Sequence, residues 1–475
     1  MSIPKTWVKT TLDFIRVDKK TSVNPLKNPD QKYELYSIPS HEFFKPEIVN
    51  GKEIGSSKIS VEPETVLLGK INPRINRVWV VGKFTKHPKI ASTEWIPFFP
   101  VEGIFPQYLS FNLQTNTVRD FLAHNVSGVG GSLMRIKPET LNGYPFPLPP
   151  LPEQHRIVAK IEELFSDLDA GVASLRKAKE QLKTYRQSVL KWAFEGKLTE
   201  EWRKKRLNLD SCDSYDGHDF KNQGNHVNHQ NHSSDNLPEG WKWVILKDIT
   251  SVISDGDHQP PPKSEKGIPF IIISNIKENE INFSNTHFVS ESYYLNLKET
   301  RRPQKGDILY TVTGSYGIPV LVKNSNKFCF QRHIGLLRPA NNINREFLFN
   351  VMCSKNVYNQ ATAVATGTAQ LTVPLSGLRG IRIPLPPSFE EQSAIVSEIE
   401  SRLSVADNLE KTIDTSLAQA EALRQSILKR AFEGKLFPQD PNDQPATELL
   451  KQIKADKEFA IKSAPKIKKR NRTRS

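Results

Sequence analysis

The chain has 475 residues, a formal net charge of +14 and a sequence pI near 9.4. Its three cysteines make no disulfide framework, and no apolar run approaches the ~20 residues that a membrane span needs, so a disulfide-rich secreted protein and a membrane protein are both disfavoured. The first residues also lack the apolar core of a signal peptide. We therefore expect a cytoplasmic protein with room for about three domains and a preference for polyanions such as nucleic acid.

Residues 1–150 form a first block that the sequence predicts to be a mixed α/β domain rich in strands. Short β-branched and aromatic runs are broken by glycine, proline and asparagine, most clearly at 64–70 and 78–81. A glycine-rich stretch at 128–132 precedes the block's last segment, which leaves through Pro147-Leu148-Pro149-Pro150.

Residues 151–198 predict a long spacer helix. Apolar residues recur every seven positions between Ile157 and Trp192, which indicates a helix packed along one seam against another helix. Pro152 suits the first helical turn, Glu153 places negative charge there, and Gly196 is a plausible C-terminal stop. The predicted seam residues of this helix are Ile161, Leu168, Leu175, Leu182 and Val189.

Residues 199–236 are rich in asparagine and histidine and poor in aromatic residues, so they predict a flexible linker that cannot bury enough surface to fold. Histidines of this kind are possible metal ligands, but no rigid element holds them in place, so we expect no metal site. The four histidines are His218, His226, His229 and His232.

Residues 237–387 form a second block with the outline of the first. Each block opens on Pro-x-x-Trp, has a strand signal near its middle (306–311 in block two), and ends on Pro-Leu-Pro-Pro. Block two is therefore also expected to be a mixed α/β domain, with its most probable helix at Ile343–Tyr358 and with Thr366–Gln370 in the place of the glycine-rich stretch.

Residues 388–440 predict a second spacer helix, because the first one is written again here. Residues 153–198 align with 391–436 at a constant offset of 238, with 20 of 46 positions identical, and both copies close on Ala-Phe-Glu-Gly-Lys-Leu. Such a repeat fixes the architecture before any single residue is interpreted. The predicted seam residues of the second helix are Ile399, Ile413, Leu423 and Ile427.

Residues 441–475 predict a short helix, near Thr447–Ala460, followed by a basic tail that begins at Lys466 and contains no acidic residue. A tail of this composition is typical of a solvated segment that contacts nucleic acid without sequence preference.

The two long helices are expected to pair with each other. Large seam residues in one copy match small ones in the other, as Leu168 matches Ala406, which suits two helices that share a fixed volume. The alternative is that each helix packs only on its own block. The preferred fold class is α+β, in which two strand-rich domains are separated by two long antiparallel coiled-coil helices in a pseudo-two-fold tandem repeat. The two blocks would then lie at opposite ends of a rod.

Motifs for chemistry are absent from the sequence. There is no Gly-x-x-x-x-Gly-Lys-Ser/Thr phosphate loop, no His-Glu-x-x-His zinc helix and no Cys-x-x-Cys pair. Asn72-Pro73-Arg74 begins like the Asn-Pro-Pro-aromatic motif of amino-methyltransferases but lacks its second proline and aromatic residue. Glu195-Gly196-Lys197 and Glu433-Gly434-Lys435 match half of a nuclease motif, but they lie at helix ends without a partner aspartate. We therefore expect a non-catalytic chain.

The repeated motifs resemble a known family. Two Pro-Leu-Pro-Pro segments, each leading to Glu-Gln, a heptad helix and Ala-Phe-Glu-Gly-Lys-Leu, are similar to those of the specificity subunit of type I restriction–modification systems. The likeness covers nearly the whole chain. Softer matches within it are Lys70–Arg77, Asp255–His258, Gln331-Arg332, Leu336–Pro339 and Pro441–Asp443.

The resemblance implies that each block is a target-recognition domain that reads one half of a split, asymmetric DNA site. The helices would set the gap between the halves and dock two modification (methyltransferase) subunits, which carry S-adenosylmethionine and flip out the adenine that they methylate. Restriction (motor–nuclease) subunits that use ATP and Mg²⁺ would join the same assembly. This chain would bind no cofactor itself.

Candidate DNA-reading residues are those whose side chains pair with base edges. Arginine and lysine fork onto guanine and asparagine and glutamine pair with adenine, although phosphate contact or ordinary surface polarity remains the alternative for each residue. In block one the candidates are Lys70, Asn72, Arg74, Asn76, Arg77 and Arg135. In block two they are Thr313, Ser315, Tyr316, Gln331, Arg332 and His333.

Two other functions compete with this interpretation. A fused endonuclease–methyltransferase would need the catalytic motifs that the sequence lacks. A stand-alone sequence-specific DNA-binding or scaffold protein without a methyltransferase partner remains the alternative, and a methyltransferase gene beside this one would argue against it.

Overall fold

The computed structural model describes residues 3–17, 19, 21–126, 134–212, 237–258 and 261–463. The chain divides into two compact units, which we call unit 1 (residues 1–175 and 415–475) and unit 2 (residues 176–414). Both boundaries between the units lie inside the long helices. Each unit therefore contains one globular block together with about half of each helix.

The block of unit 1 is built from three small sheets with strand orders β1-β10, β2-β5-β8-β3-β4 and β7-β6-β9. All pairs are antiparallel except β3 with β8. The strands are β1 (Val8–Thr11), β2 (Ser22–Val23), β3 (Lys32–Tyr36), β4 (Glu47–Asn50), β5 (Lys58–Ser60), β6 (Val66–Gly69), β7 (Val78–Val80), β8 (Lys89–Ala91), β9 (Trp95–Phe98) and β10 (Pro145–Leu148).

Helices supply many of the buried residues of the main core of unit 1. They are α1 (Leu12–Ile15), α2 (Pro106–Leu113), α3 (Asn116–His124) and, from the end of the chain, α11 (Ala446–Ser463). The short helix predicted at 447–460 is confirmed. It belongs to the block, because Ile453 is buried in the block's main core and the Ala446 N–H donates to the Thr6 carbonyl at 2.8 Å.

The block of unit 2 has sheet orders β11-β21, β12-β20-β17-β18, β16-β13-β19 and β14-β15. Only β13 with β19 is a parallel pair. The strands are β11 (Lys242–Ile245), β12 (Thr250–Asp255), β13 (Ile268–Ile271), β14 (Ile276–Lys277), β15 (Glu280–Ile281), β16 (His287–Val289), β17 (Ile308–Thr311), β18 (Pro319–Leu321), β19 (Cys329–Phe330), β20 (Ile334–Pro339) and β21 (Arg382–Leu385).

The helices of unit 2 correct two predictions. The single helix predicted at 343–358 is wrong: two helices form instead, because the Ser354 side chain accepts a hydrogen bond from the Val357 N–H and caps a new helix. The predicted flexible linker also begins with a helix, whereas residues 213–236, with all four histidines, lie outside the described residues. These helices are α5 (Glu200–Cys212), α6 (Glu291–Asn296), α7 (Arg345–Met352), α8 (Lys355–Val364) and α9 (Leu375–Arg379).

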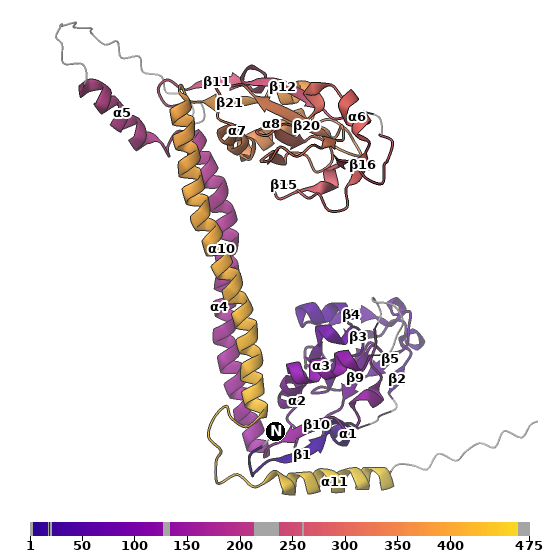
Figure 1. The fold of residues 1–475 in the computed structure, drawn as a ribbon. Coiled ribbons are helices and arrows are strands. Elements are labelled where there is room, and N and C mark those ends of the chain that lie inside the picture. The colour runs from indigo at the N-terminus through magenta and orange to yellow at the C-terminus, as the bar shows by residue number, and fades with distance from the viewer. Residues whose placement is uncertain are drawn as a thin grey trace, which may run out of the picture. The chain divides into compact units, whose positions relative to one another are not determined.

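The two long helices are α4 (Leu151–Phe194) and α10 (Phe389–Phe432), each of 44 residues, and they run side by side in each unit (Figure 1). In unit 2, Lys179 pairs with Asp414 at 2.6 Å and Arg186 pairs with Glu410 at 2.9 Å. Because the partner number falls as the α4 number rises, the helices are antiparallel. The predicted helix pairing is confirmed, and packing of each helix only on its own block is excluded.

The predicted seam residues of α4 are all buried or half-buried, and three of the four predicted on α10 are buried. On α4, Ile161 and Val189 are buried and Leu168, Leu175 and Leu182 are half-buried. On α10, Ile399, Ile413 and Ile427 are buried.

Leu423 was predicted in the seam but is 51% exposed and lies at its rim. The reason is a rotation of the helix. Its second buried row consists of the half-buried Leu403, Glu410, Leu417 and Arg424, four residues after each isoleucine or alanine of the first row.

The repeated motifs attach each helix end to a block. In unit 1 the Trp7 indole N–H donates to Glu153 at 2.9 Å, and in unit 2 the Trp241 indole N–H donates to Glu391 at 3.1 Å. Gln154 and Gln392 then accept hydrogen bonds from block backbone N–H groups, both at 2.8 Å. The Glu-Gln that starts each helix is therefore a docking point for the Pro-x-x-Trp opening of the block.

The Gly of each Ala-Phe-Glu-Gly-Lys-Leu motif completes this attachment. Gly196 and Gly434 end their helices with φ values of +71° and +67°. A Cβ atom at Gly196 would lie 2.2 Å from Pro238, and one at Gly434 would lie 2.2 Å from Pro4. The motif is therefore the place where the end of one helix receives a block, which gives the half-nuclease pattern a structural explanation.

Candidate nucleic-acid interface

The block-two candidates from two separate segments meet at one end of a sheet in unit 2. Thr311 at the end of β17 pairs with Ile334 at the start of β20, so the loops 312–318 and 331–333 lie next to each other. The Val312 N–H donates to the His333 carbonyl at 2.9 Å. Thr313, Ser315, Tyr316, Gln331, Arg332 and His333 are thus brought together, as a single recognition surface would require.

A third loop supports this end of the sheet. Residues 255–258 follow β12, and Asp257 forms a bridge with Gln331 while its carbonyl accepts the Arg332 N–H at 3.2 Å. The Asp255 carboxylate is held by His258 at 2.7 Å and by Arg301 at 3.1 Å. The Asp-Gly-Asp-His segment therefore braces the 331–333 loop. We call residues 255–258, 312–318 and 331–333 the loop end of unit 2.

A pocket of about 370 Å³ opens at this loop end, and its lining includes Lys263, His287, Gln331, Arg332 and His333. Burial and the adjacent Arg332 lower the pKa of His333 below its usual value, which keeps the imidazole neutral near pH 7. A neutral imidazole has one donor and one acceptor nitrogen, so this side chain is able to donate a hydrogen bond to a base edge or to accept one from it.

The block-two candidates divide into exposed and engaged side chains. Arg332 and Ser315 are exposed, and the Arg332 guanidinium has only a 3.4 Å contact with His333 among the described residues. Thr313 is buried and accepts a hydrogen bond from Thr372 at 3.3 Å. Tyr316 stacks on Tyr358 with ring centroids 5.7 Å apart. Arg332 is therefore the side chain that is most open to a ligand.

Unit 1 builds the same loop end from different residues. Gly69 at the end of β6 pairs with Trp95 at the start of β9, and the Lys70 N–H donates to the Glu94 carbonyl at 2.8 Å. The next two residues of each unit also pair with equivalent partners: Ile71 bridges Arg135 as Thr313 bridges Thr372, and the Asn72 N–H donates to Met134 as the Gly314 N–H donates to Leu371. We call residues 70–77, 93–94 and 134–135 the loop end of unit 1.

The loop between β6 and β7 presents Arg74 outward. Asn72 and Asn76 both have φ +49°, a left-handed conformation that asparagine tolerates, and they flank a 3₁₀ turn at Pro73–Ile75. The Asn76 Nδ2 donates to the Leu113 carbonyl at 3.0 Å, which anchors the turn. Arg74 is exposed and forms no ion pair with a carboxylate among the described residues, while Ile75 is 58% exposed.

The remaining block-one candidates are engaged in holding this loop. Lys70 donates to the Thr93 carbonyl at 2.7 Å, and its burial lowers the pKa of its ammonium group. Arg135 is forked onto Glu94 at 3.0 and 3.1 Å, and Arg77 donates weakly to the Ile71 carbonyl at 3.4 Å. These three cations give the loop end its charge and rigidity.

Sequence reasoning missed several residues of both loop ends. Glu94 braces Arg135, Arg301 braces Asp255, and Lys263 and His287 line the pocket of unit 2. None of them belongs to a repeated or recognisable motif, and Glu94 and Arg301 lie 41 and 46 residues away from the residues that they support. Only the strand pairing brings them together.

Neither a metal centre nor a membrane span is found in the part of the chain that the structure describes. No group of three or more histidine, cysteine, aspartate or glutamate side chains is placed to hold a metal ion there. No described helix is both long and apolar enough to cross a bilayer.

Comparison with known proteins gives one consistent result. The model of the type I restriction modification DNA specificity domain matches residues 4–183 and again residues 238–419. The chain is 28% identical over 348 residues to the specificity subunit of the type I restriction enzyme EcoBI from Escherichia coli, which covers 70% of this chain and 68% of that protein. It is 27% identical over 391 residues to the EcoKI specificity subunit from Escherichia coli strain K12, with 75% and 73% covered.

Solved structures share the fold. A chain from a structure of a type I R-M system matches with a TM-score of 0.71 and 20% identity, covering 92% of this chain and 100% of that one. The HsdS subunit from Thermoanaerobacter tengcongensis matches with a TM-score of 0.53 and 20% identity, covering 92% and 99%. The domain model matches this chain twice, and the two matches together cover most of the chain. This chain therefore belongs to the family of type I restriction–modification DNA specificity subunits.

Proposed function

We propose that this chain selects the DNA sequence on which a type I restriction–modification complex acts, with each unit reading one half of a bipartite, asymmetric site. The observation that carries the proposal is the loop end, which is built twice on the same strand pairing but with different side chains. Two readers with one geometry and two sets of side chains are what an asymmetric split site requires.

Charge supports a DNA ligand at both loop ends. Arg74 in unit 1 and Arg332 in unit 2 are exposed and have no carboxylate partner among the described residues. Arginine forks onto the O6 and N7 atoms of guanine, with roughly 1–3 kcal/mol of discrimination for each good pair. The net charge of +14 adds sequence-independent attraction to the phosphates.

In this proposal the paired helices set the unspecified gap between the half-sites and dock two modification subunits. S-adenosylmethionine on those subunits, and ATP and Mg²⁺ on restriction subunits, supply the chemistry, while this chain supplies sequence choice. The family consists of non-catalytic specificity subunits. The duplicated helix presents repeated residues on α4 and again on α10, which supports a partner that comes in two copies.

The test is a methylation map. The chain would be expressed with the methyltransferase from its own system in a host free of adenine methylation, and the genome sequenced for N6-methyladenine. We expect a motif of two short half-sites separated by a fixed gap. Methylation at one continuous site would contradict the two-reader proposal. No methylation by a soluble, associated complex would favour the stand-alone DNA-binding protein.

Matched variants assign each half-site to a unit. Arg74→Ala should relax the sequence preference of one half-site and Arg332→Ala that of the other, each by up to about 1–3 kcal/mol per guanine contact. Lys247→Ala removes an exposed cation of unit 2 away from the loop end and should leave both halves unchanged. An equal loss of sequence preference at both half-sites in either arginine variant would contradict the assignment of one half-site to each unit.

A further inference from the structure

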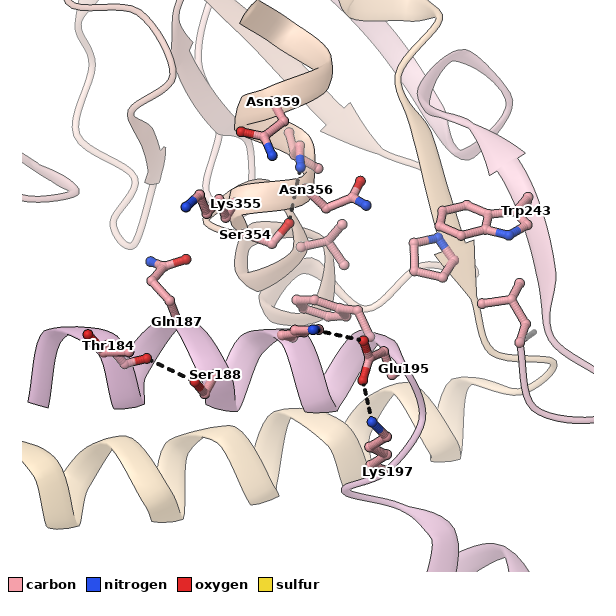
Figure 2. Close-up of a pocket in the computed structure, with 16 residues that line it drawn as sticks. Thr184, Gln187, Ser188, Glu195, Lys197, Trp243, Ser354, Lys355, Asn356 and Asn359 are labelled. Carbon is pink, nitrogen blue, oxygen red and sulfur yellow. Dashed lines mark hydrogen bonds and ion pairs between the residues drawn. The ribbon is translucent and has the colours of Figure 1, made fainter. Parts of the chain in front are cut away.

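Each unit contains a pocket between the end of a long helix and the adjoining block. In unit 2 the pocket is about 680 Å³, and Figure 2 shows Gln187 of α4 pointing toward Ser354 and Lys355 at the start of α8, with Trp243 of the block on the other side of the pocket. In unit 1 a pocket of about 650 Å³ lies between the end of α10 and the first residues of α3. These are the α4 pocket and the α10 pocket.

The two pockets are copies of one site. Six helix positions line both at the offset of 238, and five of them carry the same residue; these are Gln187 and Gln425, Ser188 and Ser426, Lys191 and Lys429, Phe194 and Phe432, and Glu195 and Glu433. On the block side, Ser354 and Thr115 cap equivalent helices. The strand residues also correspond, because Trp243 pairs with Pro384 in unit 2 as Lys9 pairs with Pro147 in unit 1.

Both pockets contain polar atoms that the described residues leave unpaired. In the α10 pocket, Asn112 is only 5% exposed and its Oδ1 accepts no hydrogen bond from a described residue. In the α4 pocket, the Trp243 Nε1–H is buried and finds no acceptor among them. Both atoms are almost fully covered by protein atoms, so the occupant of each pocket is identified by the charge and apolar character of the lining and not by these two groups.

The charge of the pockets selects an acidic occupant. Lys191, Lys197 and Lys355 line the α4 pocket against one carboxylate, Glu195, which is paired with Lys197 at 2.7 Å and with Lys191 at 3.7 Å, so the lining keeps a net positive charge. Lys9 and Lys429 line the α10 pocket against Glu433. The first turns of α8 and α3 add the partial positive charge of a helix N-terminus to each site.

An apolar groove extends the α10 pocket along the helices. Ser426 lines both the pocket and a neighbouring groove of about 540 Å³, whose walls include Leu164, Leu168, Leu423 and Leu436. The exposure of Leu423 is therefore part of a continuous surface that pairs an apolar strip with a basic pocket. Such a surface fits a segment with apolar side chains next to a carboxylate.

We propose that the α4 and α10 pockets are the two anchor sites for the modification subunits, each receiving one acidic, partly apolar peptide segment. The proposal rests on the proposed function and adds to it the residues that hold the partner. A site present twice with the same helix residues matches an occupant present as two copies of one chain, whereas the DNA half-sites differ from each other.

The experiment counts modification subunits on the full-length chain by native mass spectrometry after co-expression. The unaltered chain should carry two. Lys191→Glu should leave one, Lys429→Glu should leave one, and the double variant should leave none at concentrations where the unaltered complex is intact, a loss of at least tenfold in affinity per site. Ser188→Trp and Ser426→Trp, which fill the pockets without changing charge, should give the same pattern.

The control is Lys177→Glu, which makes the same charge change at an exposed α4 position outside both pockets and should retain two subunits. Circular dichroism confirms that each variant keeps its helices. Two subunits on the double variant would overturn the proposal, and so would full stoichiometry with weakened DNA binding, which would assign the pockets to phosphates. A bipartite methylation motif from the unaltered complex keeps the proposed function intact in either case.

Discussion

The two corners where a block meets the start of a long helix have the same geometry but different charge. In unit 2, Glu391 accepts from Trp241 at 3.1 Å, from Thr199 at 3.1 Å and from Arg203 at 2.7 Å. In unit 1, Glu153 accepts from Trp7 at 2.9 Å, but its Oε1 has no donor among the described residues. The repeated residues fix the shape of the corner, and the unrepeated residue Arg203 decides whether its buried carboxylate is neutralised.

The largest expected effect comes from removing the Arg203–Glu391 ion pair at the corner of unit 2. Arg203→Ala would leave the Glu391 carboxylate, whose side chain is 2% exposed, without its cation, and breaking a buried pair in this way costs about 3 kcal/mol. We expect much faster hydrogen exchange in β11 and β21 and unchanged exchange in β1 and β10 of the same sample. Arg206→Ala, an exposed cation on the same helix, is the control and should leave both strand pairs protected. Equal loosening in both units would contradict a local role for Arg203.

A matched pair of substitutions tests the difference between the corners directly. Glu391→Gln removes the charge that Arg203 compensates and should destabilise unit 2 by about 2 kcal/mol. Glu153→Gln keeps an oxygen for the Trp7 indole and removes a carboxylate that has no cation, so unit 1 should lose less than about 1 kcal/mol or gain stability. Hydrogen exchange of β1 and β11 measures both. A larger loss of stability in unit 1 with Glu153→Gln than in unit 2 with Glu391→Gln would contradict the difference in charge between the two corners.

The pH dependence of unit 1 follows from the same carboxylate. Burial raises the pKa of Glu153 above its ordinary 4.5, so the folded unit binds the proton more tightly than the unfolded chain does. Between 4.5 and the raised value, falling pH therefore increases the free energy of unfolding of unit 1, and rising pH decreases it. The difference in exchange protection between the unaltered chain and Glu153→Gln should grow in favour of the glutamine variant as pH rises through this window. A difference in exchange protection that does not change with pH would contradict the raised pKa of Glu153.

The repeat made much of the fold predictable. An offset of 238 residues indicated two blocks and two paired helices, and seven-residue periodicity located both helices, whose observed ends lie within eight residues of the predicted bounds. Periodicity was less informative about which face of α10 is buried. Leu409 and Leu423 are about half exposed, because the a-position isoleucines and alanines pack together with the row four residues later, which contains Glu410 and Arg424.

The loop ends were only partly predictable. Residue types suggested Arg74 and Arg332, and both are exposed. Residue types could not separate them from Lys70, Arg135 and Thr313, whose side chains hold the loops through contacts with residues 23 to 59 positions away. Whether a polar side chain is free or engaged depends on strand pairing, and a single sequence does not contain that information.

The smallest expected effects come from substitutions along the helix pair, where the two units hold equivalent arginines in different ways. In unit 2 the seam carries exposed or half-exposed ion pairs, in which Arg186 contacts Asp407 at 2.6 Å and Glu410 at 2.9 Å. In unit 1 the equivalent cation, Arg424, lies 4.1 Å from the Phe165 ring centroid as well as pairing with Asp169. Arg186→Ala should therefore cost less than about 1 kcal/mol, and the cost should fall further in high salt, because exposed pairs are screened.

Arg424→Ala should cost about 1 kcal/mol and change less with salt, because packing of the guanidinium on an aromatic ring does not depend on a second charge. Exchange rates of the α10 segments on either side of residue 414, at low and high ionic strength, separate the two effects. If both variants lost the same stability and responded equally to salt, the aromatic contact would contribute nothing. The two halves of the helix pair would then differ in sequence alone, and the contrast between the units would be confined to their corners.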